Sequence, residues 1–557
     1  MPSLPLLNRR RFIKNLAALG ASQAVLSRLS PRLLAATSDS TSRSRPPYRV
    51  IYSNDTTNIT TCVSPFRAKG QSFKPEMLEA TVDEVAGRVD AHFIQLAHGQ
   101  VPWYPSKVYP LEEHHRWWQQ HFGVSPNNDA FNVSGIHRFI LDGGDPLKVF
   151  IDRCRQTGQA PFISMRLNDV HHVEHVNTPG NLKGIHSITR FYAEHPEWRI
   201  GTDLNSWSTR TLNWAVPQVR DNVFAFIAEQ CRNYDIDGFE LDFLRHPNFF
   251  RLNETTFEER RRIMGDFIRK VRAVLDERSP RRWLSVRIPC YISGFDSIGI
   301  DLREWVDSGV DIINLSPHYF TVQQTDLVPI KAMVPDAAIY QEMCHSIWNG
   351  PRVADGYDAF TFRRATPEQY ETTAHLAYER GAAGVSLFNF AYYREHGRGE
   401  RGPFNEPPFE VLGRLRDPST LARRPQHWFV ATGWPCPFGG VRVPMPRKLS
   451  PGGTTTFDLD LAPPAGGWTG PGRLRLQGRI SLGDSRWSAS INGKSVSPTD
   501  DRSEPYPNPY PPLLGLPDEM RAWTVPASLL RPGMNQISFT LETGTETEIV
   551  YIDLGIQ

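Results

Sequence analysis

Residues 234–246 read YDIDGFELDFLRH, and this stretch decides the fold. Its second half alternates apolar and acidic residues, and the apolar ones are Phe239, Leu241 and Phe243. Side chains of a β-strand point alternately to its two faces, so Glu240 and Asp242 share one face and the apolar residues share the other. The pattern predicts a buried strand that brings two carboxylates to one place.

An amphipathic helix over residues 219–234 precedes this strand, and a helix that leads into an apolar strand is the repeating unit of a parallel α/β sheet. Seven further strands are predicted at 49–53, 91–96, 161–167, 283–288, 311–316, 337–343 and 384–390. Helical patterns separate them at 75–88, 146–157, 257–276, 302–306 and 367–380, and a last one follows at 410–415. Eight such units predict an α/β fold, a closed (β/α)₈ TIM barrel over residues 48–425, with its functional groups at the C-terminal strand ends.

Pro/Arg-rich residues 418–425 mark a domain boundary, and beyond Gly433 the composition changes to Gly, Pro, Thr and short alternating runs. Strands are predicted at 474–481, 487–491, 523–525, 536–541 and 549–554. The dipeptide Asn492-Gly493 between Ile491 and Lys494 is a hairpin signal. We therefore expect an all-β sandwich over residues 426–557, which either binds carbohydrate or packs on the barrel as a structural cap. We also expect it to be separable from the chemistry.

The N-terminus fits a twin-arginine export signal. Residues 8–14 read NRRRFIK, an apolar segment follows at 16–26, and Leu34-Ala35-Ala36 offers a small-residue cleavage site. We expect residues 1–36 to be a removed signal peptide, residues 37–47 to be a linker, and the mature protein to be periplasmic or extracellular. The alternative is a disordered basic tail.

Charge and cysteine content exclude several classes of function. The formal net charge is +2, which gives no basis for binding nucleic acid. After signal cleavage we expect no membrane partner. The six cysteines form no close pair, which excludes a C-x-x-C motif and favours buried free thiols. They are Cys62, Cys154, Cys231, Cys290, Cys344 and Cys436.

Acidic residues gather at the predicted C-terminal strand ends, where a TIM barrel has its active site. They are Asp55, Asp169, Glu240, Asp242 and Glu342. Cleavage of a glycosidic bond needs two carboxyl groups, one to protonate the leaving oxygen and one to attack the anomeric carbon or to activate water. The alternative is that these acids are solvated or form ion pairs, as a strand-end salt bridge would at Glu342.

Side chains suited to binding sugar hydroxyls and sugar faces follow the same strands. We expect substrate contacts from Asp169, His171, His172, Arg245, Asn314, His318, Tyr319, His345, Trp348 and Trp103, the last within a long aromatic loop after the second strand. Several of these histidines could converge with Asp169 on a metal ion, but no tight ligand spacing such as H-E-x-x-H is present. We therefore expect neither a metal nor a cofactor. Arg166, Arg245 and Arg287 either read an acidic sugar or pair with the carboxylates.

Residues 235–246 and the predicted barrel around them resemble the glycosyl hydrolase-like family 10 proteins, exported bacterial barrels with a YDxDGxxxD-type fourth strand. The resemblance covers residues 48–420 and implies a glycosidase fold. The stretch is also similar to the α-amylase motif DGFRxDxxxH, whose nucleophile would be Asp242, although Glu240 replaces its arginine and the fifth strand offers no glutamate. It is similar to the chitinase motif DGxDxDxE as well, with Leu244 where the catalytic glutamate would stand.

A further resemblance is to the large clan of retaining glycosidases, with an acid/base glutamate on the fourth strand and a nucleophile on the seventh. It implies Glu240 as acid/base and Glu342 as nucleophile, although Phe239 replaces the clan's asparagine. We expect Asp242 to raise the proton affinity of Glu240 by like-charge repulsion. If Glu240 and Glu342 lie far apart, Asp242 becomes the preferred nucleophile, with its acid partner sought at Asp169 or elsewhere.

The sequence thus predicts a secreted glycoside hydrolase that acts on a carbohydrate substrate. The alternative from another class is a carbohydrate-binding or surface-assembly protein whose barrel has lost catalysis. A metal-dependent hydrolase is a third possibility.

Overall fold

The computed structural model describes residues 45–55, 57–125, 135–278, 280–349, 362–394, 406–431, 445–508 and 514–556. The expected signal peptide and Cys436 lie outside these ranges. Pro46–Gln557 forms one compact unit. Within the described ranges, no helix combines the length and the apolar content that spanning a membrane requires.

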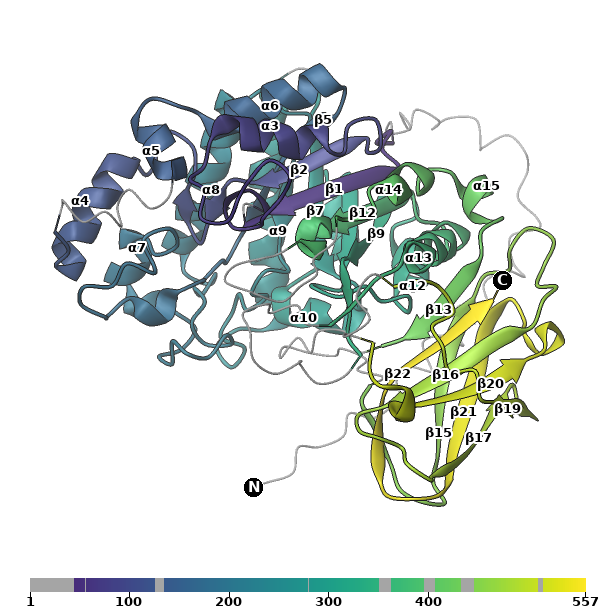
Figure 1. Ribbon diagram of the computed structural model, residues 1–557. Helices are drawn as coiled ribbons and strands as arrows, with labels where there is room; N and C mark the ends of the chain where they lie inside the picture. The colour runs from purple at the N-terminus through teal and green to yellow at the C-terminus, as the bar shows by residue number, and fades with distance from the viewer. Residues whose placement is uncertain are drawn as a thin grey trace, which may run out of the picture. The chain divides into compact units, whose positions relative to one another are not determined.

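Eight parallel strands close into a barrel, which confirms the predicted TIM barrel (Figure 1). In chain order they are β1 (Val50–Asp55), β2 (Ala91–Gln95), β5 (Ala160–Arg166), β6 (Gly238–Asp242), β7 (Trp283–Pro289), β8 (Ile312–Ser316), β9 (Ala338–Cys344) and β12 (Gly384–Phe388). Each strand pairs with its neighbours in the chain order, and β12 closes the ring on β1. The quoted stretch supplies β6, between β5 and β7.

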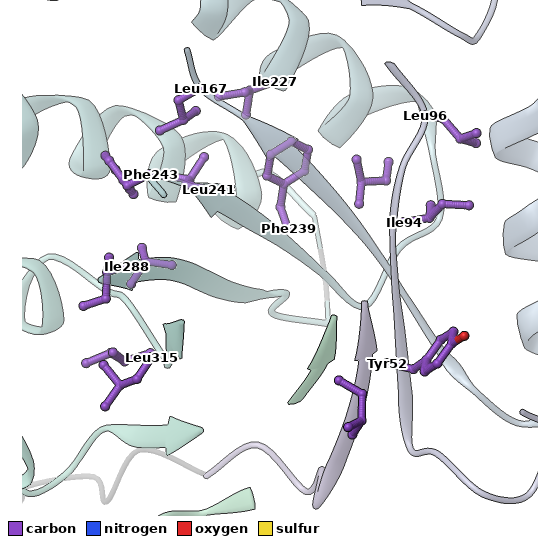
Figure 2. Packing of buried hydrophobic residues seen from close by; sticks show 14 of the residues in the cluster. Tyr52, Ile94, Leu96, Leu167, Ile227, Phe239, Leu241, Phe243, Ile288 and Leu315 are labelled. Atoms are coloured by element: carbon purple, nitrogen blue, oxygen red, sulfur yellow. The ribbon is translucent and has the colours of Figure 1, made fainter. Parts of the chain in front are cut away.

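Helices surround the strands (Figure 1). They include α3 (Pro75–Asp83), α6 (Pro146–Thr157), α8 (Pro217–Asn233), α9 (Phe257–Asp276), α11 (Leu302–Asp307), α12 (Leu327–Met333), α13 (Pro367–Glu379) and α14 (Glu410–Arg414). The start of α9 is fixed by a capping box, in which Thr256 and Glu259 satisfy each other's backbone N–H groups. Phe239 and Leu241 of β6 join the same apolar cluster as Ile227 of α8 (Figure 2), which buries the apolar face of the strand between barrel and helices.

The segment after β2 differs from the sequence prediction. The expected aromatic loop contains a hairpin of β3 (Ala97–His98) and β4 (Val101–Pro102) and the helix α4 (Leu111–Phe122). His114 and Trp118 are buried on α4, because its aromatic residues recur at helical spacing and pack inward. The helix α5 (Gly135–Leu141) follows. The aromatic residues of this segment therefore build an accessory core.

The barrel interior changes character from one end to the other. At the N-terminal end of the strands it is closed by an apolar cluster that includes Ile51, Phe93, Phe162, Ile312 and Tyr340. The next row is polar, since Ser164, Glu240 and Ser285 lie side by side in the strand register. One row further, Arg166, Asp242 and Arg287 lie side by side. Charge is thus concentrated at the C-terminal end of the strands, which in this fold is the active-site end.

Two antiparallel sheets follow the barrel, as predicted. One contains β13 (Gln426–Val430), β14 (Arg447–Leu449), β16 (Gly472–Gly478), β19 (Ser497–Thr499), β20 (Met520–Val525) and β22 (Thr547–Ile556). The other contains β15 (Thr454–Leu461), β17 (Arg486–Ile491), β18 (Lys494–Ser495) and β21 (Gly533–Thr543). The hairpin signal is confirmed: Ile491 pairs with Lys494, and Asn492 and Gly493 adopt φ values of 51° and 78°.

The β region is joined to the barrel by buried polar contacts. The Gln323 side chain donates to the His427 carbonyl at 3.1 Å and accepts from the Phe429 N–H at 2.8 Å. A buried group of charged residues continues this junction. We call it the interface network, and it consists of Arg363, His427, Arg475, Glu504 and Asp553. These contacts make the β region a structural partner of the barrel.

Candidate active site

The two carboxylates of β6 lie in successive rows of the barrel interior. Glu240 is the third residue of the five in β6 and Asp242 is the last. Both are buried, at 0% and 2% exposure. The sequence placed both at the strand end; the structure places only Asp242 there, and Glu240 lies one row deeper. The shared face predicted from the alternation is present.

Glu240 holds a proton more tightly than an ordinary glutamate. Its two carboxylate oxygens accept hydrogen bonds from Ser164 Oγ at 2.9 Å and Ser285 Oγ at 3.1 Å. Burial, and secondly the negative charge of Asp242, raise the pKa of Glu240 to about 7. Near neutral pH this group is therefore a carboxylic acid in part of the molecules. The negative charge of Asp242 raises the pKa of Glu240 as predicted, but burial is the larger cause of the shift.

Asp242 is fixed by three donors. Its Oδ1 accepts from the backbone N–H groups of Leu244 at 2.8 Å and Arg245 at 3.1 Å, and its Oδ2 accepts from Arg287 Nη1 at 2.9 Å. These donors, one of them a charged guanidinium, fix the position of the Asp242 side chain at the end of the strand.

Arg287 joins Asp242 to Glu342. Its Nε and Nη2 each lie 2.7 Å from one oxygen of Glu342, in a bidentate pair. Asn314 Nδ2 donates to Glu342 at 3.0 Å, and the Ser316 hydroxyl donates to its other oxygen. A carboxylate offers about four acceptor positions, so these four bonds occupy all of them at Glu342. The contacts of Glu342 are therefore those of a strand-end salt bridge, the alternative that the sequence left open.

Arg166 forms a second ion-pair group on the neighbouring strands. Its Nη2 lies 3.0 Å from Asp55 Oδ2 and its Nη1 lies 3.2 Å from Asp169 Oδ2. Tyr392 donates to the other oxygen of Asp55 at 2.6 Å. Burial opposes the ionisation of Asp169, but His171 and Arg166 outweigh it and hold the pKa of Asp169 well below its usual value. Asp169 therefore remains ionised and is unsuited to be the acid.

Arg245 lies beside these groups. One of its guanidinium nitrogens contacts His171 Nε2, and the guanidinium carbon lies 4.7 Å from the centre of the Tyr319 ring. His318 packs edge-on against Tyr319, with ring centres 4.2 Å apart. Burial, and secondly Arg166, lower the pKa of Arg245 to about 9. We call Asp55, Arg166, Asp169, Asp242, Arg245, Arg287 and Glu342 the mouth network.

Asp169, His171 and His246 form the one group of metal-ligand type within the described residues, with ligand atoms within 4.8 Å of one another. Two guanidinium groups adjoin it, since Arg166 pairs with Asp169 and Arg245 contacts His171. Neighbouring positive charges oppose a divalent cation. The donor set therefore fits an ion-pair network better than it fits a metal centre.

Four other residues predicted to bind substrate contact aromatic side chains. Trp103 packs against His137 and His186 of the accessory core, with ring centres 6.4 and 5.9 Å apart. Trp348 packs against Phe320 at 5.2 Å. Both tryptophans thus pack against other aromatic side chains. His345 is buried against Tyr392, and His172, in the left-handed region at φ 61°, lies beside His171.

Three residues near the mouth network were not predicted. Trp207 is 49% exposed and stacks on His246, with ring centres 4.8 Å apart. Tyr392 binds Asp55. Asn389 follows β12 directly in the left-handed region at φ 52°, and its buried side-chain amide has no hydrogen-bond partner among the residues that the structure describes. A lone tryptophan in a polar loop and an asparagine after a strand carry little sequence signal, because both are common in loops without function.

No protein-family model matches the chain, and no curated protein matches it. Among solved structures it resembles α-L-fucosidase isoenzyme 2 from Paenibacillus thiaminolyticus, with 13% identity, a TM-score of 0.40, and coverage of 67% of this chain and 49% of that chain. This chain thus spans about half of the fucosidase. An α-amylase from Geobacillus thermoleovorans is similar at 12% identity and a TM-score of 0.36, and the match covers 90% of this chain and 98% of the amylase. The glycoside hydrolase domain of PgaB (BpsB) from Bordetella bronchiseptica is similar at 12% identity and a TM-score of 0.38, and the match covers 67% of this chain and 99% of that domain. At scores this low, function has to be inferred from the residues of the site.

Proposed function

We propose that the protein is a glycoside hydrolase that cleaves a poly- or oligosaccharide with two carboxyl groups of β6. The observation that supports this most is the contrast between Glu240 and Asp242. Glu240 retains a proton up to about pH 7, while the oxygens of Asp242 accept hydrogen bonds from two backbone N–H groups and the Arg287 guanidinium. Glycosidic cleavage requires one carboxyl group that gives up a proton and a second that attacks the anomeric carbon or activates water, and unlike surroundings are how enzymes assign these two roles.

Asp242 is our choice for the carboxylate that attacks the anomeric carbon or takes a proton from the attacking water. It lies at the strand end and uses three of about four acceptor positions, so one remains for the reaction. Glu342 uses all four. The nucleophile expected at Glu342 is therefore reassigned to Asp242, and Glu342 becomes a positioning residue that orients Arg287.

Glu240 would supply the proton to the leaving oxygen. Its serine partners occupy one position on each oxygen, so each oxygen retains a second position for a ligand that reaches into the barrel. In the proposed reaction the proton of Glu240 passes to the glycosidic oxygen as the bond from that oxygen to the anomeric carbon breaks. A new bond from the same carbon to Asp242, or to a water that has lost its proton to Asp242, replaces it.

We also propose that the chain belongs with the glycosyl hydrolase-like family 10 proteins and is exported by the twin-arginine pathway. The motif at residues 235–246 supports the first proposal and residues 8–14 support the second. Replacing Arg9 and Arg10 with lysine should leave the precursor in the cytoplasm. Normal export of that double variant would remove the signal assignment.

The hydrolase proposal is tested by exposing the purified protein to a panel of polysaccharides and measuring new reducing ends. We expect release from at least one member, with the anomeric form of the first product, read by proton NMR, deciding between attack by Asp242 and attack by water. Binding of a glycan without any release would favour the alternative, a non-catalytic carbohydrate-binding or surface-assembly protein. Two observations favour this non-catalytic alternative: every acceptor position of Glu342 is occupied, and Glu240 is fully buried.

A further inference from the structure

The three arginines of the mouth network differ in how their charge is balanced. Arg166 pairs with Asp55 and Asp169, and Arg287 pairs with Asp242 and Glu342. Within the part of the chain that the structure describes, Arg245 forms no ion pair with any carboxylate, and its Nε has no hydrogen-bond partner. The residue is nevertheless only 8% exposed. Asp55, Asp169 and Asp242 lie near enough to act on Arg245 electrostatically, but among the described residues Arg245 is the arginine of the site that pairs directly with none of them.

The contacts that Arg245 does make do not replace an ion pair. One nitrogen faces His171, which is not an anion, and the guanidinium lies over the Tyr319 ring at 4.7 Å. A cation–π contact is weaker than the cost of burying an unpaired charge. The lowered pKa of Arg245, caused by burial and then by Arg166, is in keeping with this deficit. An arrangement that is unfavourable in the free protein is expected where a ligand completes it.

The position of Arg245 ties it to the proposed reaction centre. Its backbone N–H donates to Asp242 Oδ1 at 3.1 Å, so the guanidinium and the reacting carboxylate belong to one short turn after β6. Planar guanidinium groups recognise carboxylates and other oxyanions through two parallel hydrogen bonds. A sugar bound against Asp242 would therefore present a substituent to Arg245.

We propose that Arg245 binds a singly charged anionic substituent of the substrate, a sugar carboxylate or a sulfate ester, in the sugar residue next to the cleaved bond. This inference rests on the proposed hydrolase function and specifies its substrate class as acidic glycans. The unpartnered amide of Asn389 after β12 offers a further donor and acceptor for hydroxyl groups of such a sugar.

Binding is measured by calorimetry at low ionic strength with the full-length Asp242→Asn variant, so that the ligand is not consumed. The probes are oligomers of galacturonic, glucuronic and mannuronic acid, each beside its carboxyl-reduced partner, and a sulfated galactan oligomer beside its desulfated partner. We expect at least one acidic probe to bind at least about tenfold more tightly than its neutral partner. The carboxylate and sulfate arms identify the anion.

The decisive experiment introduces Arg245→Gln into the Asp242→Asn variant. Arg245→Lys, introduced in the same way, is a second variant, and Arg138→Gln is the matched control. Arg138 is an exposed arginine paired only locally with Asp142. Arg245→Gln should weaken acidic binding by about 10- to 100-fold and neutral binding by less than about threefold. Arg245→Lys, which keeps the charge without the fork, should fall between, and Arg138→Gln should change nothing.

Three results would overturn the inference: no acidic probe binds better than its neutral partner, Arg245→Gln weakens both partners equally, or it weakens neither. The two proposals fail separately. Hydrolysis of neutral glycans without dependence on Arg245 would remove the inference and leave the hydrolase. Binding of acidic glycans that depends on Arg245, without release of reducing ends by the unmodified protein, would remove the hydrolase and leave the inference.

Discussion

Two buried charge networks can be compared within this chain, the mouth network of the barrel and the interface network of the β region. In the interface network each arginine pairs with both carboxylates: Arg475 lies 2.5 Å from Asp553 and 2.8 Å from Glu504, and Arg363 lies 3.8 and 2.7 Å from the same two. In the mouth network, Arg245 pairs with no carboxylate of the described ranges. Two guanidinium groups balance two carboxylates at the interface, whereas the mouth leaves one cation without a carboxylate and one acid, Glu240, with a raised pKa.

The difference separates a structural use of buried charge from a chemical one. Direct ion pairs at the interface hold its carboxylate ionised: burial opposes the ionisation of Asp553, but Arg475 and His427 outweigh it and keep the pKa of Asp553 low. Incomplete pairing at the mouth leaves proton affinity and positive charge available to a ligand. The predictions below address first the interface and then the mouth.

The largest effect is expected from removing the β region. A chain that ends at Pro425 would lose the partners of Gln323 and Arg363, and it would expose polar groups that the barrel now buries. A polar group that stays buried without its partner lowers the free energy of unfolding by about 1–3 kcal/mol, and a charged group lowers it by more. We expect the truncated protein to be unfolded or insoluble, as judged by circular dichroism and gel filtration. A folded, soluble barrel would show that the region is separable, as the sequence had suggested.

The next largest effect is expected from Asp553→Asn. Removing one partner of a buried pair leaves the other charge uncompensated, so the free energy of unfolding should fall by about 3–5 kcal/mol. Urea denaturation measures it, with the exposed pair variant Arg138→Gln as control, for which we expect a change below about 1 kcal/mol. A change of similar size in both variants would refute the structural role of the interface network.

A smaller effect, dependent on pH, is expected at Glu240. Its pKa in the folded protein, about 7, lies above the ordinary value of 4.5, so the folded state holds the proton more tightly. The resulting stabilisation is complete below about pH 4.5 and is lost as the pH rises through 7, by up to about 3 kcal/mol. Glu240→Gln, which resembles the protonated form, should remove this loss. Stability curves of both proteins that run parallel from pH 4.5 to 8 would contradict the raised pKa.

Much of the fold followed from the sequence, because alternation and helical spacing report directly on burial. The strand at 234–246 shows this, since its apolar and acidic faces are those of β6. Helices in aromatic segments were harder to predict. The segment that forms α4 was expected to be a loop, because its polar residues obscured the helical period. The strand β13 was missed because it follows a Pro/Arg-rich stretch and spans only Gln426–Val430.

The candidate site was predictable in composition but not in pairing. Every charged member of the mouth network was named from strand-end positions, yet the sequence could not show that Arg287 would take all acceptor positions of Glu342 together with Asn314 and Ser316. That outcome depends on the stagger of neighbouring strands, which sets which side chains meet across the barrel. The nucleophile that we propose, Asp242 in place of Glu342, rests on this pairing.

The most direct test of the account compares Asp242→Asn with Asp553→Asn in one assay. Reducing-end release from the best substrate is measured per folded molecule, with the folded fraction taken from circular dichroism at the assay temperature. We predict that Asp242→Asn lowers turnover about a thousandfold or more, while Asp553→Asn lowers stability but keeps turnover per folded molecule near that of the unmodified protein. Turnover by Asp242→Asn within about tenfold of the unmodified protein would contradict the assignment of the reaction to the mouth network.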